Sequence, residues 1–388
     1  MIHSIARVLQ FIAVAGCLCS SAYYLICLWS VRGFLRGRRA NRNVQPTHGL
    51  PPVSILKPLK GTDPDIYESF RSHCLQDYPE YEIVFGVSEA DDPAVASVQK
   101  LQREFPERAI RLVVCSQKLG ANVKVSNLEQ MLAAARYQHL LVNDSDIRVE
   151  RDYLRRVMAP LMDAHIGMVT CLYRGVPAAT FGSRLEALGI STDFCPGVLV
   201  ARQLEGGVRF GLGSTLAFRR ADLEKIGGFR SFVDFLADDY ELGQRITGLG
   251  LRVELSDVVV ETHLPAYNVA GFLAHQLRWA RSVRDARAKG YIGLVSTYGM
   301  MWAMLVVIAA GGGWWSWLAF GVTVLLRFAV AIAVGSAVLE DRRLLENLWL
   351  LPVRDLTAVG VWAVSFAGHS VTWRGDRFLL KKGRLIRL

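Results

Sequence analysis

The chain has 388 residues, of which 52% are hydrophobic and 21% are charged, and its formal net charge at pH 7 is +10. The apolar fraction is too high for an ordinary soluble protein, and the charged fraction is too high for a chain buried entirely in a membrane. The positive charge would suit nucleic acid, but Arg and Lys gather beside the apolar runs, where they would face anionic lipid headgroups. We therefore expect a membrane surface as the partner and no nucleic acid.

The first apolar run, residues 8 to 31, is about long enough to span a bilayer. Arginines follow it closely, and by the positive-inside rule they place the next segment on the cytoplasmic side. A cleaved signal peptide is the alternative, but its charges should precede the apolar core, where only Arg7 stands. We expect residues 1–45 to form an N-terminal transmembrane anchor with a basic linker.

The last third of the chain is again apolar, and residues 294 to 312 and 314 to 339 predict two spans joined by a tight turn. Arg327 lies inside the second span, so it should face another helix or an acidic partner, or else snorkel. A shorter segment, residues 356 to 373, either spans against the positive-inside rule or returns as a re-entrant helix. Residues 291–388 thus predict a C-terminal transmembrane region of about three transmembrane or membrane-embedded helices.

Strands and helices alternate with short loops between residues 46 and 290, which is typical of a doubly wound α/β sheet. We expect this stretch to be one cytoplasmic domain. The expected strands cover residues 53–56, 81–87, 110–115, 139–142, 167–171, 212–219 and 258–260, and the expected helices cover residues 64–76, 128–135, 151–163, 222–226, 240–249 and 269–287.

The strand at residues 139–142 ends in Asn143-Asp144-Ser145-Asp146. Ligands of open α/β sheets sit outside the carboxyl ends of the strands, so two aspartates spaced i, i+2 could hold a divalent cation on a diphosphate. The alternative is a plain turn, because Asn, Asp and Ser favour turns through local hydrogen bonds. Whether Asp146 or His263 ligates the metal is left open.

Other polar residues follow neighbouring strands. Lys57 ends the strand at 53–56 in a basic, glycine-containing turn that could receive a nucleotide, or that is a plain loop with solvated lysines. Asp92 follows the strand at 81–87, where it either caps the next helix or binds a uracil or ribose edge. Lys124 lies in an expected loop at residues 117–128, which leads into the next helix.

Two further motifs precede the C-terminal apolar runs. Asp238 and Asp239 open the helix at 240–249, where either may simply complement the helix dipole. The helix at 269–287 is strongly basic, which favours an interfacial helix on lipid phosphates, but it could also neutralise a leaving diphosphate. Residues 185–200 are apolar but too broken to span, and could line an acceptor groove or rest on the membrane.

Together these motifs resemble the ceramide glucosyltransferase family of membrane-anchored GT-A enzymes, and its bacterial relatives linked to hopanoid lipid synthesis. The family pattern is three separated aspartate positions followed by a (Q/R)xxRW helix. The resemblance covers about residues 50 to 290, including VSILKPLKG and QKLGANVKVSNL, and departs at His275, which replaces Gln or Arg. The matching positions are Asp92 in EADDP, Asp144 in NDSDI, Asp239 in ADDYELG, and Arg278 and Trp279 in HQLRW.

The resemblance implies a GT-A type, Rossmann-like mixed sheet and a role for each matching position. Asp239 would be the general base. Asp144, with Asp146 beside it, would bind Mg²⁺ or Mn²⁺ on a UDP diphosphate. The expected nucleotide-sugar-binding residues are Lys57, Asp92, Lys124, Asp144, Arg278 and Trp279.

These roles predict an inverting transferase that moves one sugar, glucose or N-acetylglucosamine, from a UDP-sugar to a hydroxyl of a hopanoid or ceramide. One base and one metal site suffice for a single inverting displacement. We expect a multi-pass protein of the bacterial inner membrane with its catalytic domain in the cytoplasm. The alternatives are a processive polysaccharide synthase and a membrane nucleotide-sugar-binding protein without turnover.

Overall fold

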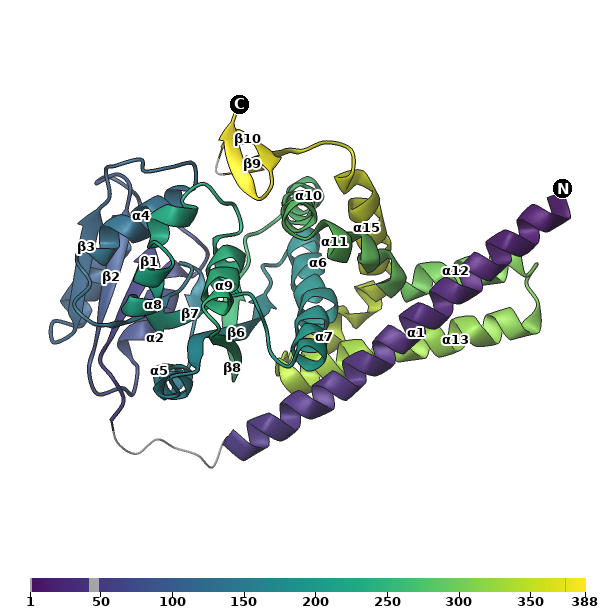
Figure 1. Cartoon of the computed structure of the whole chain (residues 1–388), viewed down its shortest axis with the longest axis horizontal. Coiled ribbons are helices and arrows are strands. Elements are labelled where there is room, and N and C mark those ends of the chain that lie inside the picture. The colour runs from purple at the N-terminus through teal and green to yellow at the C-terminus, as the bar shows by residue number, and fades with distance from the viewer. Residues whose placement is uncertain (1, 42–48, 374) are drawn as a thin grey trace.

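An eight-stranded mixed sheet forms the centre of the computed structural model, which describes residues 2–41, 49–373 and 375–388 (Figure 1). Four strands at one side run parallel, and one antiparallel strand separates them from a second parallel pair. The strand order is β3 (Ala109–Val114), β2 (Tyr81–Val87), β1 (Val53–Pro58), β4 (His139–Val142), the antiparallel β7 (Leu216–Arg219), β6 (Ile166–Val176), β8 (Arg252–His263) and β5 (Ile147–Arg148).

Helices cover the sheet and bury most of its strands, although the edge strand β3 is only partly buried. β1 and β2 are buried along their whole length, as expected for mostly apolar strands in a parallel sheet. Helix α4 (Val123–Leu132) packs against β1 and β2, and α9 (Asp238–Gly248) packs against β6 and β8. The other helices of this domain are α2 (Ile66–Cys74), α3 (Ala94–Glu104), α5 (Tyr153–Met158), α6 (Phe181–Gly189), α7 (Cys195–Glu205), α8 (Arg220–Lys225) and α10 (Val269–Ala286).

Some boundaries differ from those expected. Helix α4 begins at Val123, so Lys124 lies in its first turn and not in a loop, because the Asn122 side chain caps the helix by accepting from Val125 N. Strands β6 and β8 extend well beyond the expected ranges, since each pairs with the other through polar as well as apolar residues. The segment 185–200 is helical, with a π-helical stretch, Ile190–Phe194, between α6 and α7.

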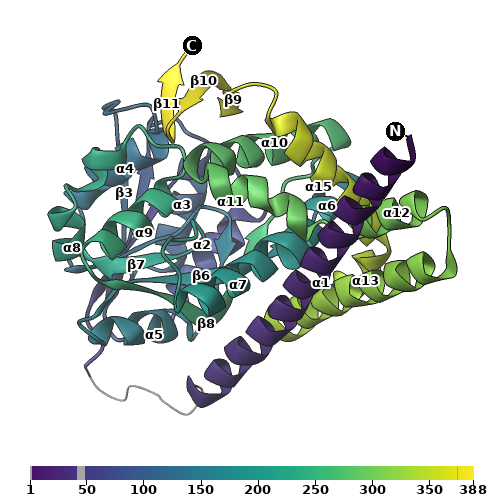
Figure 2. The same ribbon diagram turned by 45° about the vertical axis from the view of Figure 1, so that its right-hand side comes forward.

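Long apolar helices lie on the side of the molecule away from the sheet (Figures 1 and 2). Helix α1 (Ile2–Asn41) packs along α12 (Gly299–Ala309) and α13 (Trp314–Ile332). In the described chain, three helices are long and apolar enough to cross a membrane: Ala6–Ala40, Trp314–Val338 and Leu344–Ser365.

The structure refines two expectations for the C-terminal third. The expected span at 294–312 is divided between two helices, Ala288–Thr297 and Gly299–Ala309, which meet at an angle of 54° and by length and composition form a broken span or a re-entrant loop. The expected segment at 356–373 is also not one helix. Instead α15 (Leu351–Ser365) ends, and the chain continues into a small antiparallel sheet of β9 (Ser370–Trp373), β10 (Asp376–Lys381) and β11 (Arg384–Arg387).

The small sheet lies against the α/β domain (Figure 1). Arg284 of α10 donates hydrogen bonds to the carbonyls of Ser365 and Gly368, so the end of α15 is tied to the same domain. The C-terminal strands that follow the helices between Leu344 and Ser365 therefore still contact the α/β domain.

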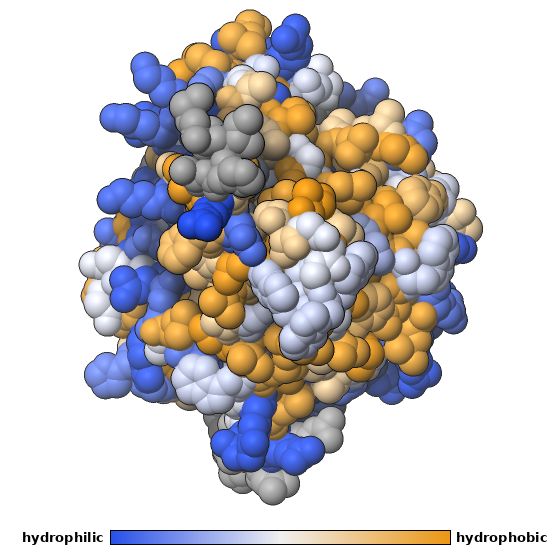
Figure 3. Space-filling model, turned by 90° about the vertical axis from the view of Figure 1, so that its right-hand side faces the viewer, coloured by the Kyte–Doolittle hydropathy of each residue, from blue (hydrophilic) through white to orange (hydrophobic). Residues whose placement is uncertain are grey.

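The face formed by the long helices is largely apolar, with hydrophilic residues gathered towards its edges (Figure 3). Phe11 and Leu18 of α1 and Trp314 and Leu325 of α13 are all more than half exposed. Soluble monomers rarely expose so continuous an apolar surface. The helices therefore indicate membrane association.

Candidate active site

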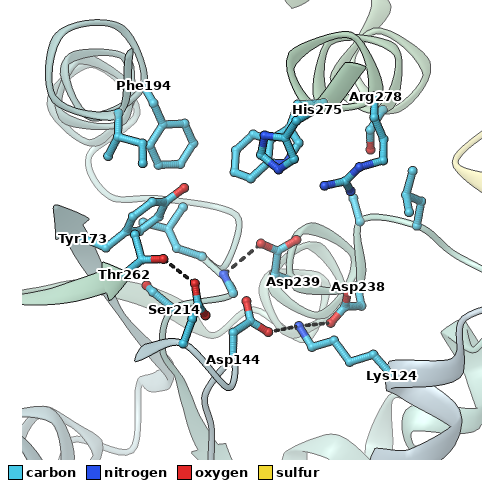
Figure 4. Close-up of a pocket in the computed structure, with 18 of the residues that line it drawn as sticks. Lys124, Asp144, Tyr173, Phe194, Ser214, Asp238, Asp239, Thr262, His275 and Arg278 are labelled. Atoms are coloured by element: carbon cyan, nitrogen blue, oxygen red, sulfur yellow. Dashed lines mark hydrogen bonds and ion pairs between the residues drawn. The ribbon is translucent and has the colours of Figure 1, made fainter. Parts of the chain in front are cut away.

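A cavity of about 530 Å³ opens where the carboxyl ends of β4 and β8 meet the N-terminus of α9 (Figure 4). One side carries carboxylates, the opposite side is aromatic, and α10 lies across the top. The expected residues Asp144, Asp146, Asp239, Lys124, Arg278 and Trp279 all line it, together with Asp238, His263 and His275.

Lys124 links two of the carboxylates. Its ammonium lies 2.8 Å from Asp144 Oδ1 and 3.0 Å from Asp238 Oδ2. Burial alone would lower the pKa of Lys124, but these two carboxylates, with a further contribution from Asp239, raise it well above its ordinary value. Lys124 therefore stays protonated and fixes the position of both partners.

Asp239 is held by neutral hydrogen-bond donors. Gly213 N donates to its Oδ2 at 2.9 Å, and Tyr240 N donates to its Oδ1 at 2.8 Å. Burial and the neighbouring Asp238 raise the pKa of Asp239 to about 6, against the opposing charge of Lys124. A carboxyl group with this pKa is ionised at neutral pH and is a stronger base than an ordinary aspartate.

The loop that carries Gly213 was not expected to belong to the site. A Cβ atom on Gly213 would lie 2.8 Å from Asp144 Oδ2 and 3.5 Å from Asp239 Oδ2. One on Gly243 of α9 would lie 2.5 Å from the Cα of Phe210. Both glycines therefore allow the loop and α9 to approach each other closely. The signal in the sequence was the pair of glycines that flank Leu212.

Asp146 is a second half-buried carboxylate, and a neutral donor holds it. Thr262 Oγ1 donates to its Oδ2. Burial, and then repulsion from Asp144, raises the pKa of Asp146 to about 6. A cation placed beside both aspartates would remove this repulsion.

These residues fit a divalent cation only if its other ligands come from outside the protein. Among the described residues, no group of three His, Cys, Asp or Glu side chains could hold a metal ion. His263 also lines the cavity, with its Nδ1 3.1 Å from Asp65 Oδ2 and its Nε2 3.6 Å from Glu261 Oε2. Asp144 and Asp146 leave coordination positions that phosphate oxygens and water can fill, as Mg²⁺ prefers.

Lys57 and Asp92 are not among the described residues that line the cavity. Lys57 is fully buried and donates to the carbonyl of Asp144 at 2.9 Å, and burial lowers its pKa to about 7. Both carboxylate oxygens of Asp92 accept from Gly61 N at 3.0 Å, and Oδ1 also accepts from Ala94 N. In this structure Lys57 holds the backbone of the loop that carries Asp144. Asp92 links the loop after β2, in which it lies, to the loop after β1 through Gly61.

Helix α10 presents His275, Arg278 and Trp279 to the cavity. His275 and Arg278 point towards Asp239 (Figure 4). His275 Nδ1 lies 3.4 Å from Oε1 of the buried Glu186, whose Oε2 accepts from Gln276 Nε2 at 2.8 Å. Glu186 was not expected from the sequence, where it is one carboxylate within an apolar stretch.

Four rings, which we call the aromatic wall, close the side of the cavity opposite the carboxylates. Phe194 of the π-helical stretch packs against the other rings, with ring centroids 5.3 Å from Tyr173 and 5.9 Å from Trp279. Tyr267 stacks on His275 at 5.3 Å. The wall consists of Tyr173, Phe194, Tyr267 and Trp279.

Comparisons with known proteins agree with this geometry. The family described as "Glycosyl transferase family 21" matches residues 12–386. Ceramide glucosyltransferase 1 of Caenorhabditis elegans is 24% identical over 396 residues, covering 97% of this chain and 82% of that protein. Ceramide glucosyltransferase 3 of the same organism is 27% identical over 245 residues, covering 63% of this chain and 53% of that protein.

A solved structure shows the same fold. The mannosyltransferase PcManGT from Pyrobaculum calidifontis, in complex with GDP-Man and Mn²⁺, superposes with a TM-score of 0.55 at 21% identity. The match covers 92% of this chain and 99% of that one. The expected GT-A-like mixed α/β fold is thereby confirmed.

Proposed function

The chain belongs to glycosyl transferase family 21, and from this premise we propose that it transfers one sugar from a UDP-sugar to a hydroxyl of a membrane lipid, with inversion. It is a glycosyltransferase by family and by fold. The observation that carries the finer proposal is Asp239, a half-buried carboxylate with a raised pKa that lies between cationic groups and the aromatic wall.

Asp239 is the general base of the proposed reaction. It takes the proton of the acceptor hydroxyl while that oxygen attacks the anomeric carbon and the bond from this carbon to the diphosphate breaks. The other nearby aspartates are less suited, because Lys124 holds Asp144 and Asp238 in ion pairs. A single displacement of this kind inverts the anomeric centre.

The departing diphosphate would lie beside Lys124 and Arg278, whose charges stabilise it. Asp144 and Asp146 would hold Mg²⁺ or Mn²⁺, which would neutralise further diphosphate charge when bound. Support comes from the raised pKa of Asp146, since two neighbouring carboxylates that are partly removed from solvent are a favourable place for a cation.

The acceptor would be a ceramide or hopanoid whose hydroxyl reaches Asp239 past the aromatic wall. Support comes from the ceramide glucosyltransferases among the relatives and from the apolar helices next to Phe194. Arg32, Arg36 and Arg39 near the C-terminal end of α1 favour the cytoplasmic face, and we propose the bacterial inner membrane.

The test is a transfer assay with the full chain in lipid nanodiscs. UDP-[¹⁴C]glucose and UDP-[¹⁴C]N-acetylglucosamine would each be offered with Mn²⁺ and either ceramide or bacteriohopanetetrol, and products would be identified by mass spectrometry. We expect a lipid carrying one sugar. Polymeric product would favour a processive synthase, and UDP binding without turnover would favour a non-catalytic binding protein.

A further inference from the structure

The three C-terminal strands lie over the segment that leads into Asp239. Leu236 N donates to Gly383 O at 3.1 Å, and Leu385 N donates to Asp234 O at 2.7 Å. These two bonds pair Phe235 with Arg384 as an antiparallel bridge. Residues 234–236, immediately before α9, therefore pair with β11 and extend the C-terminal sheet.

A separate apolar cluster supports this pairing. Leu236 and Trp373, which both line the cavity, belong to it, and so does Ala121, which precedes Lys124 by three residues. The arginines Arg245 and Arg384 lie over the ring of Phe235, at 5.7 and 5.1 Å from its centroid. The cluster comprises Leu236, Val371, Phe378, Leu380 and Leu385, with Ala121 and Trp373 packed against it.

The small sheet is also tied to α10. Arg281 donates to Ser370 O at 2.6 Å, and Gly383 N donates to Asp285. On its other side the segment 234–236 is held by the start of α4, where Asn122 Nδ2 donates to Phe235 O at 2.7 Å. The segment is therefore fixed between α4, which carries Lys124, and the C-terminal sheet, which is fixed to the helix of Arg278.

Helix α9 needs such support because its own first turn is weakly capped. Its N-cap is Ala237, whose methyl group cannot accept a hydrogen bond from the helix. The direction of α9, and with it the Asp239 carboxylate, therefore depends on how residues 234–236 are held. A misplacement of about 1 Å at a reacting group can cost about a hundredfold in rate.

We infer that the C-terminal β9–β11 sheet is a working part of the active site, which positions the base Asp239 through residues 234–236 and closes the cavity with Trp373. The inference rests on the proposed function, because the positioned group is its base. The basic residues of this sheet would then serve the active site, whereas the composition of the chain suggested contacts with lipid headgroups.

Two turn glycines provide a matched test. Gly383 and Gly375 occupy the two hairpin turns of this sheet with φ of 79° and 90°, so a side chain strains the backbone similarly at both. A Cβ on Gly383 would lie 3.1 Å from the Phe235 ring, whereas no described heavy atom lies within 4 Å of one on Gly375. Gly383→Leu should therefore push the sheet off Phe235, and Gly375→Leu should not.

The activity experiment compares both variants with the parent in nanodiscs, using UDP-[¹⁴C]glucose and ceramide. We expect kcat to fall at least twentyfold in Gly383→Leu, with KM for UDP-glucose and the calorimetric stoichiometry of UDP–Mn²⁺ binding unchanged. Gly375→Leu should stay within twofold of the parent. If the stoichiometry of UDP–Mn²⁺ binding is unchanged, the protein is still folded, and the fall in kcat then reflects a displaced base.

Hydrogen exchange tests the contact without relying on turnover. The amides of Leu236 and Leu385 should be protected in the parent and in Gly375→Leu, and should exchange at least tenfold faster in Gly383→Leu. Free exchange of both amides in the parent, or loss of protection in Gly383→Leu with parental kcat, would overturn the inference. A parent that transfers neither glucose nor N-acetylglucosamine to ceramide or bacteriohopanetetrol would instead overturn the proposed function, and exchange would still decide whether the sheet holds the segment.

Discussion

Two groups of buried charge in this protein differ in how completely they are neutralised. The first, the membrane-side cluster, joins the π-helical stretch to α13 and α15. Arg327 lies 2.6 Å from both Asp193 and Asp355, and Arg354 lies 2.9 Å from Asp193. Two guanidinium groups thus match two carboxylates, and Arg327 meets an acidic partner, which is one of the alternatives expected from the sequence.

The second group, the pocket carboxylates, is not matched in this way. Lys124 pairs with Asp144 and Asp238, while neutral donors hold Asp146 and Asp239. Burial raises the pKa of both Asp146 and Asp239 to about 6. A balanced cluster is complete without a ligand, whereas an excess of half-buried carboxylates is stabilised by a proton or a cation. A transferase that binds a diphosphate and removes a proton needs such a site.

The largest effect should come from Asp239→Asn. Asparagine keeps the size of the side chain and an oxygen that can accept from Gly213 N, but it cannot take a proton. We expect kcat to fall by about 10³-fold, within the range for loss of a general base, while KM for the UDP-sugar changes little. Steady-state transfer assays measure both constants, and a parental kcat would remove Asp239 from the role of base.

Arg327→Leu should act on stability instead of chemistry. It leaves Asp355 buried without its cation, so we expect the free energy of unfolding in detergent to fall by about 3–5 kcal/mol. The double variant Arg327→Leu, Asp355→Leu should recover much of that loss, since Asp193 keeps Arg354. Thermal unfolding of the three proteins tests this. A stable Arg327→Leu protein with no activity would mean that the membrane-side cluster is functional.

The sequence was most informative where a local pattern decides the structure. The strands expected at 53–56, 81–87 and 139–142 are mostly apolar and lie in the sheet, where the first extends to Pro58, and α10 follows its expected range within one residue. The aspartates at strand ends could be foreseen to share one edge, because parallel strands bring their carboxyl ends together.

Local sequence patterns could not predict contacts between segments that are distant in the chain. Lys57 looks like a solvated loop residue, and only the neighbouring strands show that its ammonium is buried beneath Asp144. Gly213 matters because two carboxylates approach it from other elements. The strands after Ser370 are short and basic, and their pairing depends on Phe235, far away in the chain.

Gly213→Ala should reduce activity less than loss of the base. The added methyl group would lie 2.8 Å from Asp144 Oδ2. The Asp144 carboxylate cannot move freely away from it, because Lys124 holds the other oxygen, Oδ1. A displacement approaching 1 Å predicts a loss in kcat/KM of about 10- to 100-fold. Gly248→Ala is the control, because no described heavy atom lies within 4 Å of a Cβ there. Equal activity of the two variants would show that the pocket carboxylates tolerate rearrangement.

Asp146→Asn should change stability in the opposite direction to Arg327→Leu, because without a bound metal ion it should stabilise the protein. The pKa of Asp146 is about 6 when folded and 3.8 in its ordinary state, so the folded protein binds a proton more readily than the unfolded chain. Its ionisation therefore costs stability above pH 6, and stability returns as the pH falls from 6 towards 4. In EDTA at pH 7.5 the variant should gain about 1–3 kcal/mol, and the gain should vanish near pH 4. Unfolding curves at both pH values measure this difference. A variant less stable than the parent at pH 7.5 would mean that Asp146 is already neutralised by the protein, as the acids of the membrane-side cluster are.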